Sequence, residues 1–157
     1  MSNSETMLAV GDKLPSDLGF DSEGKMVHSE DFAGKPLIVY FYPKDNTSGC
    51  TAEACSIRDD YARLTGMGYV VIGISKDSAA SHVKFAGKYS LPFLLLSDES
   101  TEVNQAFGVW QKKKMAGREY MGTVRTTFVT DADHRIMHVV KKVDTKRAGT
   151  QLIELLS

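Results

Sequence analysis

The sequence predicts an α/β fold in which a mixed central sheet carries helices on both faces. Two continuous apolar runs, over 35–43 and 69–75, are rich in β-branched and aromatic residues, which is typical of strands buried inside a sheet. Helical patterns alternate with these runs, as they do where crossover helices join parallel strands. A hairpin and a closing helix follow, so the predicted order of elements is β-α-β-α-β-α-β-β-α.

The first part of the chain is expected to contain a hairpin, a buried strand and a long helix. Residues 1–12 are polar, and we expect them to be loosely ordered. A short hairpin should turn at 22–24, and the first buried strand should stop at Pro43 because proline cannot donate to a sheet ladder. A helix is then expected over 48–65, ended by two nearby glycines.

The rest of the chain completes a thioredoxin-like layout with an N-terminal hairpin extension. The remaining elements are expected as a strand over 69–75, a helix over 78–89, a strand over 91–98, a short helix over 99–109, a hairpin over 126–143 that turns near 132–133, and a closing helix over 144–157 whose Leu152, Ile153, Leu155 and Leu156 face inward. The segment QKKKM at 111–115 is expected to be a solvated loop. A length of 157 residues suits one domain spanning 1–157.

The composition and charge of the chain narrow the kinds of binding partner and the cellular compartment that we expect. A net charge of -1, from 19 basic and 20 acidic residues, gives no reason to expect a nucleic-acid or acidic-substrate surface. No apolar run approaches the roughly 20 residues that span a bilayer, and the N-terminus lacks the pattern of a signal peptide. The expected compartment is therefore the cytoplasm. Two cysteines in such a chain favour catalysis, redox sensing or core packing over a structural disulfide.

The two cysteines, Cys50 and Cys55, fall in the helix expected after Pro43. Cys50 follows a run of capping residues, so it should lie in the first helical turn, where free backbone N–H groups and the helix dipole favour a thiolate. It heads an inward-facing stripe that continues with Ala54, Ile57, Tyr61 and Leu64. Cys55 lies about 140° around the helix and is off this stripe.

The spacing of the cysteines sets what they can do together. Five residues along an α-helix separate the Cα atoms by roughly 8.7 Å, whereas a disulfide needs them within about 7 Å. Cys50 and Cys55 therefore cannot bond while the helix is intact, and two unrelated, inert cysteines remain an open alternative. Two thiolates without clustered partners fall short of the ligands of a zinc site, and the four histidines are scattered, so we expect no metal.

The stretch FYPKDNTSGCTAEAC resembles the active-site pattern P-x-x-x-T/S-x-x-C of the peroxiredoxins, here Pro43, Thr47 and Cys50. The second cysteine is similar to that of the bacterioferritin comigratory protein, or peroxiredoxin Q, branch. Distant segments such as RTTFVTD also resemble that branch, and the likeness covers nearly the whole chain. Many members carry Thr-Pro-Gly-Cys where this chain has Ser48 before Gly49, which we expect to change the opening of the loop and not to abolish activity.

The resemblance implies a thiol-dependent peroxidase that reduces hydrogen peroxide and organic hydroperoxides. Cys50 corresponds to the peroxidatic cysteine, which would become a sulfenic acid. Cys55 matches the resolving cysteine, which would condense with it into an intrachain disulfide. Thioredoxin, or a similar dithiol, would then reduce this disulfide. No cofactor is implied: no metal, haem or flavin takes part.

The resemblance also implies roles for residues around the thiol. Thr47 offers a hydroxyl to the peroxide and the thiolate, and Arg125 matches the family arginine that supports both the thiolate and the transition state. Pro43 shields the pocket, and the backbone N–H of Gly49 can bind a peroxide oxygen. Glu53 is placed to orient Arg125. Three of these residues have a simpler alternative role. Thr47 could be only a helix N-cap, Arg125 could be a surface arginine, and Glu53 could be a solvated acid in the first helical turn.

Two other functions compete with the peroxidase. A protein dithiol–disulfide oxidoreductase would need C-x-x-C at the helix start, and the segment CTAE does not supply it. A redox-regulated binding protein or chaperone would use unwinding of the helix to expose apolar surface. Because intrachain resolution needs no second subunit, a monomer is favoured and a dimer stays possible.

Overall fold

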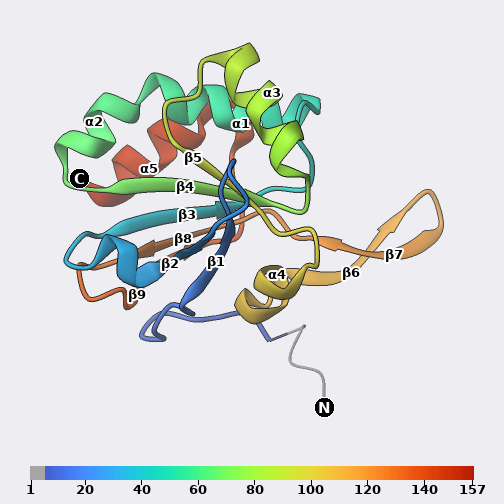
Figure 1. Cartoon of the computed structure of the whole chain (residues 1–157), viewed down its shortest axis with the longest axis horizontal. Coiled ribbons are helices and arrows are strands. Elements are labelled where there is room, and N and C mark those ends of the chain that lie inside the picture. The colour runs from blue at the N-terminus through green and yellow to red at the C-terminus, as the bar shows by residue number, and fades with distance from the viewer. Residues whose placement is uncertain (1–5) are drawn as a thin grey trace.

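The computed structural model describes residues 6–157, and a seven-stranded mixed sheet lies at its centre (Figure 1). The strands are β1 (Asp17–Phe20), β2 (Met26–His28), β3 (Leu37–Phe41), β4 (Val70–Ser75), β5 (Leu94–Ser97), β8 (Thr126–Thr130) and β9 (Ile136–Val140). Their order across the sheet is β2-β1-β5-β4-β3-β8-β9. Strands β3, β4 and β5 run parallel and the other pairs are antiparallel, which confirms the predicted mixed sheet and the N-terminal hairpin.

The helices cover both faces of the sheet unevenly. One face carries α1 (Ser48–Asp59), α2 (Tyr61–Gly66), α3 (Ala79–Tyr89) and α5 (Ala148–Leu156). The other face is covered by α4 (Glu102–Phe107) and by the segments that lead into and out of β1 (Figure 1). Short 3-10 turns occur at η1 (Ser29–Phe32) and η2 (Thr145–Arg147). None of the helices in the described residues is long and apolar enough to cross a membrane.

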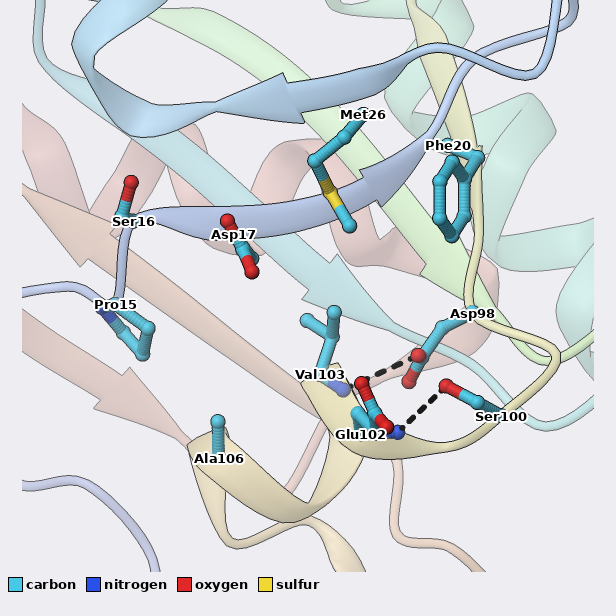
Figure 2. A pocket seen from close by; sticks show the side chains of 10 residues that line it. All are labelled: Pro15, Ser16, Asp17, Phe20, Met26, Asp98, Ser100, Glu102, Val103 and Ala106. Carbon is cyan, nitrogen blue, oxygen red and sulfur yellow. Dashed lines mark hydrogen bonds between the residues drawn. The ribbon is translucent and has the colours of Figure 1, made fainter.

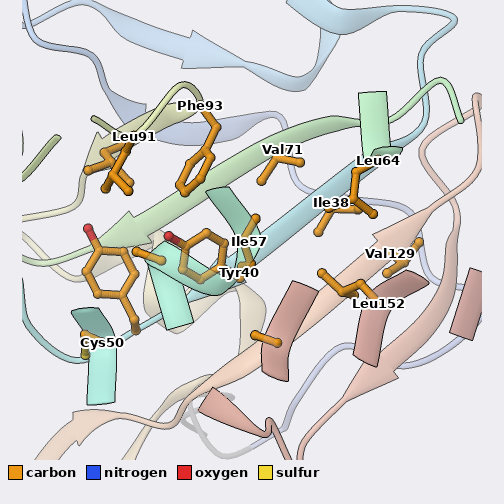
Figure 3. Packing of buried hydrophobic residues seen from close by; sticks show 14 of the residues in the cluster. Ile38, Tyr40, Cys50, Ile57, Leu64, Val71, Leu91, Phe93, Val129 and Leu152 are labelled. Carbon is orange, nitrogen blue, oxygen red and sulfur yellow. The ribbon is translucent and has the colours of Figure 1, made fainter. Parts of the chain in front are cut away.

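Strand β3 supplies side chains to two hydrophobic cores, one on each face of the sheet. Its alternate residues Ile38 and Tyr40 enter the core beneath α1, α3 and α5 (Figure 3). The residues between them enter the second core, where the ring of Phe41 lies 4.8 Å from that of Phe107 in α4. Since successive side chains in a strand point to opposite faces, this run must be apolar throughout to serve both cores.

The helix predicted over 48–65 is interrupted at Asp60. There φ is −103° and ψ is 7°, and the Asp60 N–H donates back to the carbonyls of Ser56 and Ile57. Helix α5 lies against this point, where the Gly149 N–H donates to Ser56 Oγ at 2.9 Å. The inward stripe of α1 and α2 is otherwise as predicted: Cys50, Ala54, Ile57 and Leu64 are buried, and Tyr61 packs against the same core.

Two further predictions are corrected. The segment 111–115 is no loop: it belongs to β6 (Trp110–Met115), which pairs with β7 (Arg118–Thr123) in a hairpin that projects from the body (Figure 1). Its turn residues, Ala116 and Gly117, both have positive φ, as a two-residue hairpin turn requires. In α5, Leu155 is 38% exposed because its position falls outside the stripe of this helix that contacts the core.

The N-terminal segment predicted to be loose is only partly described. Its residues 1–5 lie outside the described part of the chain. Within the rest, the Leu8 N–H donates to the Phe107 carbonyl at 3.1 Å, and the Gly11 N–H donates to the Ile136 carbonyl at 2.8 Å. These hydrogen bonds attach residues 8–11 to the side of the sheet that carries α4.

We expect Gly149→Ala to destabilise the protein by about 1–3 kcal/mol, since a Cβ there would lie 2.5 Å from both Asp60 Oδ2 and the Ser56 carbonyl oxygen. Gly87→Ala in α3 is the matched control. A Cβ at Gly87 meets nothing within 4 Å, so alanine should instead stabilise by roughly 0.5–1 kcal/mol. Urea unfolding of both variants measures the difference. Equal effects of the two substitutions would contradict the close packing of α5 on α1.

Candidate active site

Cys50 lies at the start of α1, where the sequence places it. The loop after β3 leads to Thr47, the N-cap residue, whose extended backbone precedes the first helical turn. The Thr51 N–H donates to the Thr47 carbonyl at 2.8 Å and closes that turn. The Cys50 side chain points into the core beneath the helix and the residue is 2% exposed (Figure 3). Its sulfur is therefore shielded from water and lies close to the positive end of the helix dipole.

Arg125 connects Cys50 to a buried acid. It lies in the link between β7 and β8, and its Nη2 donates to Cys50 Sγ at 3.3 Å. Its Nη1 donates to Glu53 Oε1 at 2.5 Å, although the two residues are 72 positions apart in sequence. A Cβ at Gly49 would lie 3.3 Å from Nη2, so glycine at this position leaves the guanidinium room to approach the thiol.

Glu53 is completely buried beside this guanidinium. Burial raises the pKa of its carboxyl to about 7, although the positive charge of Arg125 acts in the opposite direction. Its second oxygen, Oε2, has no hydrogen-bond partner among the described residues. Burial by itself would lower the pKa of the Arg125 guanidinium. The negative charges of Glu53 and then of Cys50 outweigh the effect of burial, so the pKa of Arg125 is raised.

Tyr40, on β3, belongs to the same buried cluster as Cys50 (Figure 3). Burial, followed by the charges of Glu53 and Cys50, holds the pKa of its hydroxyl well above the usual range. The hydroxyl therefore stays protonated and remains a hydrogen-bond donor. Neither it nor the buried Thr51 hydroxyl has a partner within residues 6–157.

The structure brings the predicted residues together to different degrees. Arg125, Glu53 and Gly49 all surround Cys50. Thr47 is exposed, and its Oγ1 donates to the Lys44 carbonyl at 2.8 Å, so the expected contact of this hydroxyl with the thiol is not formed among the described residues. Its oxygen keeps lone pairs that can accept another hydrogen bond. Pro43 follows β3 and is half-buried at the base of the loop.

Cys55 is not brought to Cys50. Both cysteines are free, and α1 is continuous through both of them, so helical geometry holds their Cα atoms roughly 8.7 Å apart. Cys55 is half-buried and lines a surface hollow together with Asp59, Asp60 and Lys146. This agrees with the prediction that an intact helix keeps the two thiols separate.

A buried polar network that the sequence reasoning missed holds the loop before Cys50. Asp45 Oδ1 accepts from the Tyr42 hydroxyl at 2.6 Å, and Asp45 Oδ2 accepts from Ser81 Oγ at 2.7 Å and lies 2.6 Å from His82 Nδ1. His82 Nε2 lies 3.0 Å from the Leu96 carbonyl oxygen, so both ring nitrogens have a polar partner.

This network fixes Asp45 to α3. Burial disfavours its charge, but hydrogen bonds from His82 and Tyr42 outweigh burial and lower the pKa of the Asp45 carboxyl. The signal was present in the sequence: His82, Phe85 and Tyr89 recur at helical spacing, which places the histidine on the inner stripe of α3.

A separate hollow of about 290 Å³ lies between the hairpin β1–β2 and α4 (Figure 2). Phe20, Met26 and Val103 supply its apolar wall. Asp98 on its rim accepts the Val103 N–H at 3.1 Å and the Asn104 N–H at 2.7 Å, so this carboxylate caps α4. None of the residues around Cys50 lines this hollow, and the geometry of the thiol is independent of it.

Comparison with known proteins assigns the family. Residues 10–139 match the AhpC/TSA family. The chain is 41% identical over 150 residues to Peroxiredoxin Bcp of Bacillus subtilis, a match that covers 95% of each chain. It is 44% identical over 132 residues to Peroxiredoxin Bcp of Escherichia coli K12, covering 84% of this chain and 85% of that protein. The chain belongs to the AhpC/TSA family, within its Bcp/peroxiredoxin Q branch.

Solved structures similar to this chain agree with its assignment to the peroxiredoxins. The bacterioferritin comigratory protein of Xanthomonas campestris, described for its alkyl peroxide reduction, has a TM-score of 0.85 at 30% identity, covering 94% of this chain and 97% of that one. A peroxiredoxin Q of Xylella fastidiosa has a TM-score of 0.87 at 29% identity, covering 96% of both chains. The protein is thus a thiol peroxidase with a thioredoxin-like fold.

The burial of Glu53 predicts a specific pH dependence of stability. Its pKa of about 7 lies above the ordinary carboxyl value of 4.5, so the folded state holds a proton that the unfolded state has lost between these pH values. The stabilisation from this group is full below pH 4.5 and is lost as the pH rises through 7. Relative to Glu53→Gln, we expect the wild type to lose about 3 kcal/mol between pH 4.5 and pH 8.

Urea unfolding of the wild type and Glu53→Gln across this range measures the effect. Asp59→Asn, at an exposed acid of the same helix, is the control and should follow the wild type at every pH. A constant difference between wild type and Glu53→Gln over the whole range would show that Glu53 has an ordinary pKa.

Proposed function

We propose that Cys50 is the peroxidatic cysteine of this peroxidase, with hydrogen peroxide and organic hydroperoxides as substrates. The observation that carries the proposal is the hydrogen bond from Arg125 Nη2 to Cys50 Sγ at the start of α1. A buried sulfur that accepts from a guanidinium near a helix N-terminus is favoured as a thiolate, the nucleophilic form. The same guanidinium can stabilise charge that develops on the peroxide oxygens.

The reaction that follows is a two-electron transfer. The Cys50 thiolate attacks the terminal peroxide oxygen, an S–O bond forms and the O–O bond breaks. The leaving alkoxide or hydroxide takes a proton and departs as an alcohol or water, and the sulfur is oxidised to a sulfenic acid. Thr47 offers an acceptor oxygen, the Gly49 N–H offers a donor to the peroxide, and Pro43 limits the entry of water. Glu53 orients Arg125 through the contact to Nη1.

We further propose that Cys55 resolves the sulfenic acid. Its thiolate would attack the sulfur of oxidised Cys50, forming an intrachain S–S bond as the S–O bond breaks, and the leaving hydroxide takes up a proton and departs as water. Because α1 is continuous through both residues, its first turns must unwind before this bond can form. An external dithiol of the thioredoxin type would reduce the disulfide in the cytoplasm. Resolution within one chain requires no second subunit, which favours a monomer.

We expect steady consumption of NADPH when the wild type is mixed with hydroperoxide, thioredoxin and thioredoxin reductase. Cys50→Ser should abolish it because the nucleophile is absent. Cys55→Ser should consume a single equivalent of peroxide and then stop. No turnover by the wild type with either class of hydroperoxide would overturn the proposal. Full thioredoxin-linked turnover by Cys55→Ser would remove Cys55 from the resolving role.

Amide hydrogen exchange provides an independent prediction about the helix. Reduced protein should show protected amides through Cys55, and oxidised protein should exchange faster over the first turns of α1, because disulfide formation requires them to unwind. Amides of α3 serve as the internal control and should keep their protection. Identical exchange over 48–56 in both redox states would exclude the proposed unwinding.

A further inference from the structure

Three consecutive lysines on β6 lie in different environments. The strand alternates, so Lys112 and Lys114 are exposed on one face of the hairpin and lie 4.0 and 3.9 Å from the carboxylate oxygens of Glu119. Lys113, between them, is half-buried on the opposite face and pairs with Tyr120 of β7. Most of this hairpin is exposed, so a lysine side chain would ordinarily extend into solvent. The half-buried position of Lys113 therefore requires an explanation.

The inward position of Lys113 depends on a glycine and ends on a carbonyl. Its Nζ donates to the Thr123 carbonyl oxygen at 2.9 Å. A Cβ at Gly122 would lie 3.0 Å from Lys113 Cδ, so glycine leaves space for the lysine stem to lie across β7. Because the stem is packed and the ammonium is hydrogen-bonded, the charge is held at a defined position.

That position is next to the segment that carries Arg125. Thr123 is buried, and its Oγ1 donates to Asn104 Oδ1 at 2.7 Å. The following N–H, of Val124, donates to the Val109 carbonyl at 2.8 Å. The carbonyl oxygen that accepts the hydrogen bond from the Lys113 ammonium thus belongs to a fixed piece of backbone, two residues before Arg125.

The electrostatic environment of Lys113 is consistent with this placement near the thiol. Burial lowers the pKa of its ammonium, the positive charge of Arg125 lowers it further, and the negative charge of Cys50 acts in the opposite direction. Lys76 contributes a weaker lowering, and its own ammonium lies 5.7 Å from the centre of the Trp110 ring. The thiol and Lys113 are therefore within range of one another's charge.

A count of charges shows why a second cation matters. When Glu53 is ionised, its negative charge and the Cys50 thiolate together exceed the single positive charge of Arg125. Paired buried charges are tolerated far better than an unbalanced one. A second positive charge held near this cluster would restore the balance, and the ammonium of Lys113 is held on the segment that leads to Arg125. The charged and titratable groups around Cys50 are then Arg125, which contacts its sulfur, Glu53, which binds the same guanidinium, and Tyr40 and Lys113, each of which interacts with the charge of Cys50.

We propose that Lys113 is a second cation of the peroxidatic site, a positioning residue that acts through the Arg125–Cys50 pair and favours the thiolate by its charge. The proposal rests on the assignment of Cys50 as the nucleophile. It differs from the family pattern read from the sequence, in which Arg125 is the only cation. It also gives a role to the QKKKM segment, whose central lysine differs from its neighbours.

The test measures thiolate formation without peroxide, in a Cys55→Ser background so that Cys50 is the only thiol. The rate of Cys50 alkylation by iodoacetamide is followed against pH for Lys113→Met, Lys113→Gln and Lys113→Arg. We expect the midpoint of the profile to move to higher pH in Lys113→Met and Lys113→Gln, with alkylation on the acid side slowed roughly three- to tenfold. Lys113→Arg should restore the profile because it retains the charge.

Lys112→Met and Lys114→Met are the matched controls, since each removes one lysine charge from the exposed face of the same strand. Both should leave the profile unchanged. A midpoint for Lys113→Met equal to that of Lys112→Met, or a wild-type profile in Lys113→Gln, would overturn the proposal. Urea unfolding of each variant verifies that it is folded. Since the readout uses no peroxide, absence of peroxidase turnover in the wild type would refute the proposed function separately.

Discussion

The bridge that Arg125 makes between Cys50 and Glu53 is the interaction on which the site depends. Its three members come from α1 and from the link between β7 and β8, so local structure alone cannot form it. The antiparallel pairing of β3 with β8 aligns Phe41 with Thr126, the residue after Arg125. The exit of β3, which leads to Cys50, and the entry to β8, which carries Arg125, are thereby held side by side. The central sheet thus acts as the frame that fixes a thiol against a guanidinium.

A second constraint follows from burying charge beside that thiol. Glu53 is enclosed, one of its oxygens has no partner among the described residues, and its pKa of about 7 leaves it close to the point where it gains or loses a proton under ordinary conditions. The site can therefore hold its thiolate with a protonated Glu53, or with an ionised Glu53 and a further cation nearby. The second arrangement explains why the hairpin β6–β7, exposed over most of its length, directs one lysine inward.

Local patterns in the sequence predicted much of the fold and the position of the thiol. The apolar run of β3 and the capping residues before Cys50 each determine their own local conformation. Both could therefore be predicted without knowing which distant segments pack against them. The break at Asp60 could not, because it occurs where Gly149 of α5 lies against α1. The strand at 110–115 was missed because both of its faces are mostly polar and no apolar alternation marks it. The distances from Arg125 to Cys50 and Glu53 depend on strand pairing across 72–75 residues, which the sequence does not state.

The attachment of Asp45 to α3 has a consequence for the chain between the two cysteines. Asp45 is held by Tyr42, Ser81 and His82, and at the other end the Ser56 hydroxyl accepts a hydrogen bond from the Gly149 N–H of α5. The segment between these points contains both thiols and the first turns of α1, and its two ends are already fixed. Rearranging such a segment carries no new closure entropy, because the rest of the fold has brought its ends together. Conformational change near Cys50 can therefore be confined to about ten residues, and of the core residues only Cys50 and Ala54 lie within them.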